Sequence, residues 1–472
     1  MLFNTLAYAV FLPVVFILYW VIPAKYRWIL LLAASYYFYM SWNYKYVVLI
    51  LFTTLVSYAA ALFLERTKKR AAKNVIVIAA LCLCLGVLFV FKYYNFAVST
   101  LSHLFHFSPR YLNLLLPVGI SFYTFQTLSY VIDVYRGDVP AEKHFGKYAT
   151  FVSFFPQLVA GPIERSASLL PQIHRKHEID LENMYYGIRL IVWGLFKKMV
   201  VADNLAVFVD QVYGDIYSFS GGTILIATVF FSVQIYCDFS GYSDIARGSA
   251  KLFGIELMEN FKSPYFATSV RDFWGRWHIS LSSWFRDYLY IPLGGNRVGR
   301  FRNCINVMVT FLVSGLWHGA NWSFVVWGGI HGLAQVFENV LGIKKAKGHG
   351  VLVFLRRAAV FVFVAFAWIF FRADNVQQGF YAVGSLFQGI SHPLLYLREG
   401  FHAVGLHWDF LPYLALYFIP LFVFDFVSLK KDIPAWIGSK GSVLRHGYMI
   451  ILIVFLLFFC YVGKSTFVYF QF

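Results

Sequence analysis

Long apolar segments recur along the whole chain and constrain its fold more than any other feature. They include residues 5–22, 46–64, 75–91, 224–235 and 449–462, and several approach the roughly 20 residues that a helix needs to cross a bilayer. A mean hydropathy of +0.64 is also far above that of soluble domains. We predict an all-α, polytopic integral membrane protein with about 11 to 12 spans plus re-entrant or interfacial helices.

The first apolar segment, residues 5–22, resembles a spanning helix more than a secretion signal. It has no basic stretch before it and no small-residue cleavage pattern. We therefore expect it to be retained as a helix.

The basic residues indicate how the chain lies in a membrane. The net charge of +17 could suggest nucleic acid, but basic residues cluster between apolar runs, at Lys25 and Arg27, at 66–73 and at 344–357. This placement is typical of cytoplasmic loops facing anionic lipid, so we expect contact with membrane lipid and no nucleic acid. The loop near 103–108 is almost uncharged, and this alternation places the N-terminus outside the cytoplasm.

Histidine and cysteine spacing does not predict a metal site. His144, His174 and His177 do not place two ligands on one helix face, and they lack an acidic third partner. The five cysteines contain no CxxC pair. We therefore expect no metal ion.

The chain reads as one membrane domain, residues 1–472, with three regions. N-terminal helices occupy 1–135, a central region occupies 136–335, and C-terminal helices occupy 336–472. Charged, aromatic and glycine residues crowd together within the central region, from 236 to 332. Ionisable groups are costly in hydrocarbon and usually face protein or a wet cavity, so function is expected here.

Three segments of the central region combine polar groups with aromatic rings: 236–244, 271–282 and 315–322. If the second segment is helical, it places Trp274 and His278 one turn apart. It would then lie low in the membrane or dip into it.

Two histidines each lie inside a pair of glycines spaced four residues apart. Such pairs let helices approach closely, and an imidazole held there can stay neutral and accept a proton; alternatively it only hydrogen-bonds a neighbouring helix. On one continuous helix His318 and His331 would be roughly 20 Å apart, so only one can be the base. We favour His318 and expect His331 near the membrane boundary, against Trp327. The pairs are Gly315 with Gly319, and Gly328 with Gly332.

Two aspartates in the first segment invite a reading as a catalytic pair. Asp238 and Asp244 would point about 240° apart on a helix and could not share a proton. We expect structural roles for them, such as ion pairs with Arg271 or Arg247.

Five motifs together resemble the membrane-bound O-acyltransferase family, and within it the bacterial alginate O-acetyltransferase type. The resemblance runs the full length of the chain, and the motifs occur in the family's order. They are Phe155-Pro-Gln-Leu-Val-Ala-Gly-Pro-Ile-Glu164, Asp238-Phe-Ser-Gly-Tyr-Ser-Asp244, Phe273-Trp-Gly-Arg-Trp-His278, Ser314-Gly-Leu-Trp-His-Gly319 and Phe371-Arg-Ala373.

The resemblance implies catalytic roles for two histidines. His318 matches the family's central catalytic histidine, and His278 matches its second site position. The implied fold is a ring of tilted helices around a thinned centre, with a funnel from each face. A cytosolic thioester donor and an extracytoplasmic acceptor would then meet at the histidine.

Acyl transfer chemistry is consistent with these assignments. A neutral histidine with a pKa near ~6.5 can take the proton of an attacking hydroxyl. A donor for the oxyanion could be His278, Asn321 or a backbone N–H. Arg271, Arg276 and the Arg297, Arg300 and Arg302 cluster could steer the phosphates of coenzyme A, or could be topology signals. The candidate substrate- and donor-binding residues are Trp277, Arg276, Trp317, Asn321 and Trp322.

The expected function is transfer of an acetyl group from a cytosolic thioester, acetyl-CoA, to an extracytoplasmic cell-surface or secreted polysaccharide. The transfer would be direct or through an extracytoplasmic relay protein, in a bacterial cytoplasmic membrane, with no permanently bound cofactor. One alternative is D-alanyl or other acyl transfer to teichoic acid by the same fold. Another is transport of a polysaccharide or lipid, although the repeats and paired intramembrane charges typical of transporters are not evident.

Overall fold

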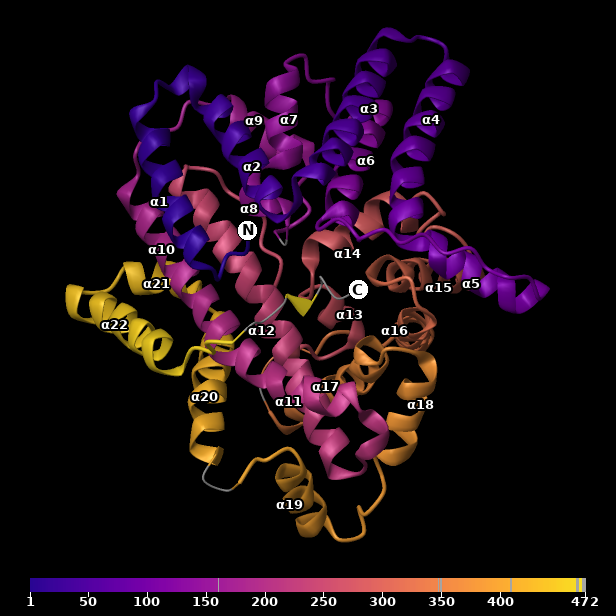
Figure 1. Ribbon diagram of the computed structural model, residues 1–472, viewed down its shortest axis with the longest axis vertical. Helices are drawn as coiled ribbons and strands as arrows, with labels where there is room; N and C mark the ends of the chain where they lie inside the picture. The colour runs from indigo at the N-terminus through magenta and orange to yellow at the C-terminus, as the bar shows by residue number, and fades with distance from the viewer. Residues whose placement is uncertain (160, 347, 349, 408–409, 464–466, 469–472) are drawn as a thin grey trace. The chain divides into compact units, whose positions relative to one another are not determined.

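The computed structural model describes residues 1–159, 161–346, 348, 350–407, 410–463 and 467–468, and these residues form helices and no strand (Figure 1). The helices of the first half are α1 (Leu6–Val21), α2 (Arg27–Asn43), α3 (Val47–Arg66), α4 (Arg70–Leu88), α5 (Tyr94–Phe105), α6 (Ile120–Arg136), α7 (Phe145–Ser153), α8 (Phe155–Leu158), α9 (Ser166–His174), α10 (Leu181–Leu195), α11 (Asp203–Gly214) and α12 (Gly222–Leu252). Those of the second half are α13 (Val270–Trp274), α14 (Ile279–Phe285), α15 (Arg300–His318), α16 (Trp322–Leu341), α17 (Val351–Arg372), α18 (Val376–Ser385), α19 (Pro393–Ala403), α20 (Leu411–Ser428), α21 (Ile433–Gly438) and α22 (Ser442–Phe459). Short 3₁₀ or π segments are η1 (Ala24–Tyr26), η2 (Tyr44–Tyr46), η3 (Phe89–Tyr93), η4 (Phe196–Ala202), η5 (Ile216–Ser218), η6 (Pro264–Phe266) and η7 (Arg286–Tyr290).

Six helical stretches within the described ranges are long and apolar enough to cross a membrane, which confirms a multi-pass membrane protein. Helix α1 is apolar but shorter. Helix α16 falls outside this set because it carries His331, Gln335 and Glu338 among its apolar residues. The six stretches are Ala24–Arg66, Arg70–Phe105, Gly222–Leu252, Val351–Arg372, Leu411–Ser428 and Ser442–Phe459.

The chain divides into two compact units. The first comprises Met1–Ile191 and Tyr242–Glu259, and the second comprises Val192–Gly241 and Asn260–Phe472. The candidate residues at 270–331 therefore all belong to the second unit.

In the first unit, helix α3 lies beside α4 and α6 (Figure 1). The loop after α8 contains Glu164, which is almost completely buried and accepts a hydrogen bond from the backbone N–H of Met258 at 2.6 Å. Burial raises the pKa of Glu164 to about 7, although this hydrogen bond and nearby arginines act in the opposite direction.

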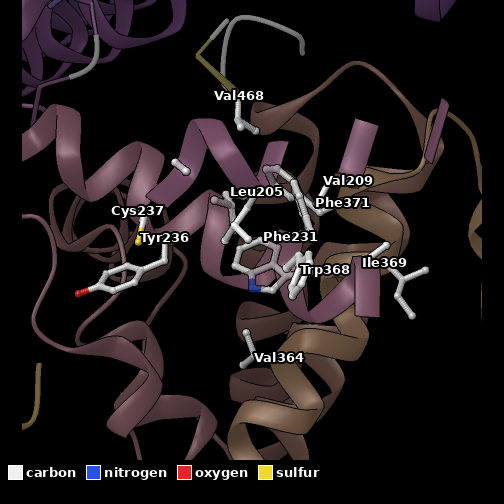
Figure 2. Packing of buried hydrophobic residues seen from close by; sticks show 14 of the residues in the cluster. Leu205, Val209, Phe231, Tyr236, Cys237, Val364, Trp368, Ile369, Phe371 and Val468 are labelled. Carbon is white, nitrogen blue, oxygen red and sulfur yellow. The ribbon is translucent and has the colours of Figure 1, made fainter. Parts of the chain in front are cut away.

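The second unit has a large apolar core. Figure 2 shows side chains from distant parts of the chain in it, including Leu205 of α11, Phe231 of α12 and Trp368 of α17. Most of these side chains are completely buried. The core fixes the inner face of α17, which also carries Phe371.

A buried ionic group crosses this apolar core. Lys198 Nζ lies 2.7 Å from a carboxylate oxygen of Asp203 and 2.7 Å from one of Asp238, and the other Asp238 oxygen accepts a hydrogen bond from the Val468 N–H at 2.7 Å. Buried charges are stable only when paired in this way. The predicted structural role of Asp238 is confirmed, but its partner is Lys198 and not an arginine.

Asp244, the other aspartate of that segment, lies in the first unit. One of its carboxylate oxygens is 3.4 Å from Arg247 Nη1. The expected ion pair with Arg247 is therefore confirmed.

Helices α15 and α16 form a tight hairpin in the second unit. A Cβ built at Gly315 would lie 2.2 Å from the Phe324 carbonyl oxygen, and one at Gly328 would lie 2.3 Å from the Phe311 carbonyl oxygen. Each of these Cβ positions is also within 3.4 Å of the other glycine's Cα. Close helix approach through the glycine pairs is thus confirmed.

Candidate active site

The segment 271–282 is not one helix, so the predicted one-turn spacing of Trp274 and His278 is wrong. Helix α13 ends at Trp274, and His278 precedes α14 with φ +44° and ψ 53°, in the left-handed region. Backbone hydrogen bonds to another segment cause the break: Lys262 N–H donates to Arg276 O at 2.9 Å, and Ile279 N–H donates to Asn260 O at 3.0 Å. These bonds replace the helical ladder.

His278 is completely buried at this break. Its ring packs edge-on against Phe239, with centroids 4.6 Å apart, and its Nδ1 lies 3.2 Å from Asn260 Oδ1. His278 is outside the six candidate spans, and burial lowers its pKa to about 3. The side chain is therefore neutral at physiological pH.

His318 is the last residue of α15 and is 3% exposed. The centroid of its ring lies 5.0 Å from that of Trp317, 5.0 Å from that of Trp327 and 5.4 Å from that of Phe371. The His278 ring follows at 6.3 Å. The structure therefore brings together the two histidines that the sequence analysis singled out.

His331 is nearer to this cluster than a single helix would allow. The chain turns between α15 and α16, so both His318 and His331 pack against Trp327, at 5.0 and 5.1 Å between centroids. The expected separation of roughly 20 Å assumed a continuous helix and does not apply. His331 makes the predicted Trp327 contact, but it is completely buried inside the protein. Its Nδ1 accepts a hydrogen bond from Trp274 Nε1 at 3.3 Å.

The other predicted binding residues have varied surroundings. Trp277 and Trp317 are buried in the aromatic cluster, whereas Trp322 is 51% exposed. Asn321 caps α16 by accepting from the Ser323 N–H, and its amide nitrogen donates to the Asp374 carbonyl at 2.6 Å. The Asn321 amide thus caps α16 and ties the turn before it to the loop that follows α17.

Arg276 belongs to a clamp around the Asp272 carboxylate. One Asp272 oxygen accepts from Arg276 Nε and from Lys345 Nζ, both at 2.9 Å, and the other accepts from the Thr268 N–H at 3.1 Å. Burial raises the pKa of Asp272, but the bonds from Lys345 and Arg276 outweigh it and hold the pKa below its ordinary value. The clamp joins α13 to the segment that follows α16.

A cavity of about 390 Å³ lies next to the histidine cluster, and some of its lining residues are close to the histidines in sequence. Ile279 lines it directly after His278, and Ser314 lines it one turn before His318. Arg271 and Arg286 also line it, while Arg276 and the other predicted binding residues do not. The full lining is Arg271, Trp274, Gly275, Ile279, Leu281, Ser282, Ser283, Phe285, Arg286, Tyr290, Val307, Thr310, Phe311, Ser314, Gln335 and Asn339.

Within the described ranges, no group of three or more histidine, cysteine, aspartate or glutamate side chains could hold a metal ion. The cluster instead offers buried imidazole rings beside an apolar wall. Such groups suit proton transfer in a water-poor site.

The chain belongs to the membrane-bound O-acyltransferase family. The family model matches residues 141–383, which include both α15 and α16. The chain is therefore an O-acyltransferase of the membrane.

Within this family, the chain is similar to the alginate O-acetylase type. It is 38% identical over 447 residues to the probable alginate O-acetylase AlgI of Pseudomonas aeruginosa, covering 93% of this chain and 84% of that protein. It is 36% identical to the peptidoglycan O-acetyltransferase of Helicobacter pylori, covering 80% and 78%. It is 29% identical to the teichoic acid D-alanyltransferase of Streptococcus thermophilus, covering 48% and 58%.

Sequence reasoning did not single out Asn260, which contacts His278, or Glu338, whose carboxylate caps α13. Glu338 accepts hydrogen bonds from the N–H groups of Val270 and Arg271, at 2.6 and 3.0 Å. Asn260 is far from His278 in sequence and lies in no periodic pattern. Glu338 carried one signal, an acidic residue on an apolar helix, which often marks a buried partner.

Proposed function

We propose that the chain transfers an acetyl group from acetyl-CoA, a cytosolic thioester, to a hydroxyl of an extracytoplasmic polysaccharide. The observation that carries the proposal is His318, buried at the end of α15 with His278 beside it. The names of the alginate and peptidoglycan relatives support acetyl as the group and a glycan as the acceptor.

In the proposed reaction, His318 is the general base. Its imidazole takes the proton of the attacking hydroxyl while the hydroxyl oxygen forms a bond to the thioester carbonyl carbon. The tetrahedral intermediate then collapses with cleavage of the C–S bond, and the imidazolium returns the proton to the thiolate. The surrounding rings of Trp317, Trp327 and Phe371 exclude water, which protects the thioester from hydrolysis.

The cavity beside the cluster suits the thioester arm of the donor. Its volume of about 390 Å³ is within the range of small-molecule sites. Arg271 and Arg286 supply positive charge, and Ser282, Thr310 and Gln335 supply hydrogen-bonding groups for amides. Coenzyme A is a co-substrate in this proposal and is not permanently bound.

We also propose that the protein lies in a bacterial cytoplasmic membrane with its N-terminus outside the cytoplasm. The support is the alternation of basic and uncharged loops. With that orientation an extracytoplasmic relay protein or the glycan itself would approach from the outer side, and membrane lipid would surround the exposed apolar helices.

The test compares cells that express the wild-type chain with cells that express His318→Ala. Acetate released by mild base from extracted surface glycans, alginate and peptidoglycan separately, measures acetyl transfer. Loss of general base catalysis should lower it roughly 100-fold or more. Equal membrane abundance and equal thermal unfolding show that the variant is folded. Undiminished acetylation by folded His318→Ala would refute His318 as the base.

D-Alanyl transfer is a second candidate, because one matching relative is a teichoic acid D-alanyltransferase. That match covers only about half of the chain, whereas the alginate-type match covers 93%. Supplying membranes with either acetyl-CoA or a D-alanyl thioester, each labelled in the acyl group, separates the two. We expect label transfer from acetyl-CoA.

A further inference from the structure

Asn260 is a buried residue whose side-chain oxygen contacts the segment that contains His278. It is 1% exposed, and its Oδ1 accepts from the Ser280 N–H at 3.1 Å and from the Ser280 hydroxyl at 3.0 Å. A backbone N–H can only donate, so the amide atom that faces it must be the oxygen. The orientation of the Asn260 amide is therefore fixed.

The orientation of Asn260 determines the protonation of His278. His278 Nδ1 lies 3.2 Å from the same Oδ1. Since an amide oxygen only accepts hydrogen bonds, Nδ1 must carry the hydrogen. A neutral His278 then has its lone pair on Nε2.

Asn260 also holds the unusual backbone of His278. His278 has φ +44°, in the left-handed region, where the Cβ of a non-glycine residue is crowded by the following carbonyl oxygen. The Asn260 backbone oxygen accepts from the Ile279 N–H at 3.0 Å, directly after His278. One residue therefore fixes both the ring and the main chain of His278.

We propose that Asn260 is a positioning residue that holds His278 as the Nδ1–H tautomer, so that His278 acts through Nε2 as a hydrogen-bond acceptor and not as an oxyanion donor. This inference rests on the proposed acetyl transfer for its catalytic meaning. The Nε2 lone pair then accepts a hydrogen bond from a proton-bearing group of a substrate other than the hydroxyl whose proton His318 takes.

This assignment narrows the choice of oxyanion donor. His278 cannot donate through Nε2 while it is neutral in this tautomer. Of the donors considered from sequence, two are left: a backbone N–H, and the second N–H of the Asn321 amide, whose first donates to the Asp374 carbonyl.

The tautomer can be measured directly, without any assumption about substrate. Full-length protein in detergent, labelled with ¹⁵N at both histidine ring positions, gives separate signals for protonated and unprotonated ring nitrogens. The ring-nitrogen signals that are missing from the spectrum of His278→Gln belong to His278. We expect protonated Nδ1 and bare Nε2 in the wild type, and a mixture of tautomers in Asn260→Leu. A protonated Nε2 in the wild type, or an unchanged tautomer in Asn260→Leu, would overturn the proposal.

The catalytic consequence is measured with acetyl-CoA as the probe, by following thiol release in membranes across a pH series. Asn260→Leu should lower kcat roughly 100-fold, because the acceptor nitrogen of His278 is no longer fixed.

Asn260→Asp keeps an oxygen acceptor and should restore much of the rate. The carboxylate also stabilises the imidazolium, so the acid limb of the profile should move to higher pH. His318 is a titratable ring that packs against His278, and a His318→Gln background shows which of the two histidines produces the limb.

The matched control is Asn306→Ala. Asn306 is another asparagine of the second unit with 1% exposure, and its amide nitrogen donates to the carbonyls of Leu293 and Gly295 at 3.2 Å. Asn306 lies 12 residues before His318 on α15, about 18 Å along the helix axis, so Asn306→Ala should lower stability while leaving the pH profile in place. A limb that moves equally in Asn306→Ala and Asn260→Asp would show a general packing effect and refute the positioning role. A further outcome separates the two proposals. If neither the wild type nor any variant releases thiol from acetyl-CoA, but the tautomer of His278 is as expected, the acetyl-CoA proposal fails and the tautomer assignment stands.

Discussion

At the scale of single residues, two buried histidines of one cluster are held in opposite protonation patterns. His278 Nδ1 faces the oxygen of Asn260 and must donate, whereas His331 Nδ1 accepts from Trp274 Nε1. Both side chains are completely buried. In each case a single neighbouring side chain determines which ring nitrogen carries the hydrogen. The two histidines can therefore donate and accept hydrogen bonds through different ring nitrogens.

Replacing Trp274 with Phe should destabilise the protein without direct damage to His318. The change removes the donor to His331 Nδ1 and leaves a buried acceptor unpaired, which costs roughly 1–3 kcal/mol. A lower unfolding temperature in detergent is the expected result. Trp322→Phe, at a side chain that is 51% exposed, serves as the control and should leave the temperature nearly unchanged. An equal effect of the two changes would contradict the assigned hydrogen bond.

The Asp272 clamp should make stability depend on pH. The folded state holds the pKa of Asp272 below its ordinary value of about 3.9. The carboxylate therefore contributes stability that is present above the unfolded pKa and is lost as pH falls through the lower folded pKa. Asp272→Asn should be less stable than the wild type at pH 7, and in a thermal unfolding series the gap should narrow as pH falls below the ordinary carboxyl pKa of about 3.9. A gap that stays constant with pH would exclude the ionic contribution.

At the scale of elements, the glycine pairs of α15 and α16 position the candidate base. A Cβ at Gly328 would meet the backbone oxygen of Phe311, which cannot move as a side chain can. The two helices therefore sit at a distance that only glycine allows. Because His318 is the last residue of α15, this contact determines where His318 lies.

Gly328→Ala should separate the two helices and lower acetyl transfer by shifting His318. The neighbouring Gly329→Ala is a matched control, because its Cβ would meet only a side-chain carbon of Leu312 at an ordinary 3.7 Å. We expect a fall in activity of roughly 10-fold or more for Gly328→Ala, since a misplacement of about 1 Å can cost about 100-fold, and little change for Gly329→Ala. Equal activity of the two variants would contradict the positioning role of the glycine contact.

Much of the element pattern could be predicted from the sequence. Apolar runs at 5–22, 46–64 and 75–91 predicted helices that the structure has as α1, α3 and α4, and the glycine spacing predicted the close contact of α15 with α16. The break before His278 could not be predicted, because backbone hydrogen bonds with Asn260 and Lys262, which are remote in sequence, create it. The sequence did indicate a turn before α16, through Gly319 and the helix-capping residue Asn321. These two residues alone do not predict that α15 and α16 pack as a hairpin.

At the scale of the whole molecule, the sequence predicts which side of the membrane each loop faces. The positions of the helices alone do not define this orientation. Basic residues between α3 and α4 and an almost uncharged loop after α5 indicate opposite sides of the membrane. The thioester donor and the glycan acceptor would approach from these two sides. Orientation is therefore part of the proposed function.

Cysteine labelling in intact cells tests the orientation. Lys68 and Ser108 are exposed in the two loops, and each is changed to Cys in a chain whose own cysteines are replaced by Ala. A membrane-impermeant maleimide should label Ser108→Cys and spare Lys68→Cys. After the membrane is permeabilised, both should react. Labelling of Lys68→Cys alone in intact cells would place the N-terminus in the cytoplasm.

The short turn between α15 and α16 also has a consequence for biosynthesis. Contacts between residues near in sequence close small loops and form early. Gly315 and Gly328 are such a pair, so the hairpin with His318 and Trp327 can assemble once α16 has left the ribosome. Helix α17, which brings Trp368 and Phe371 to the cluster, is made later. A chain that stops after α16 is therefore expected to contain the histidine hairpin but to lack part of the apolar wall that shields it.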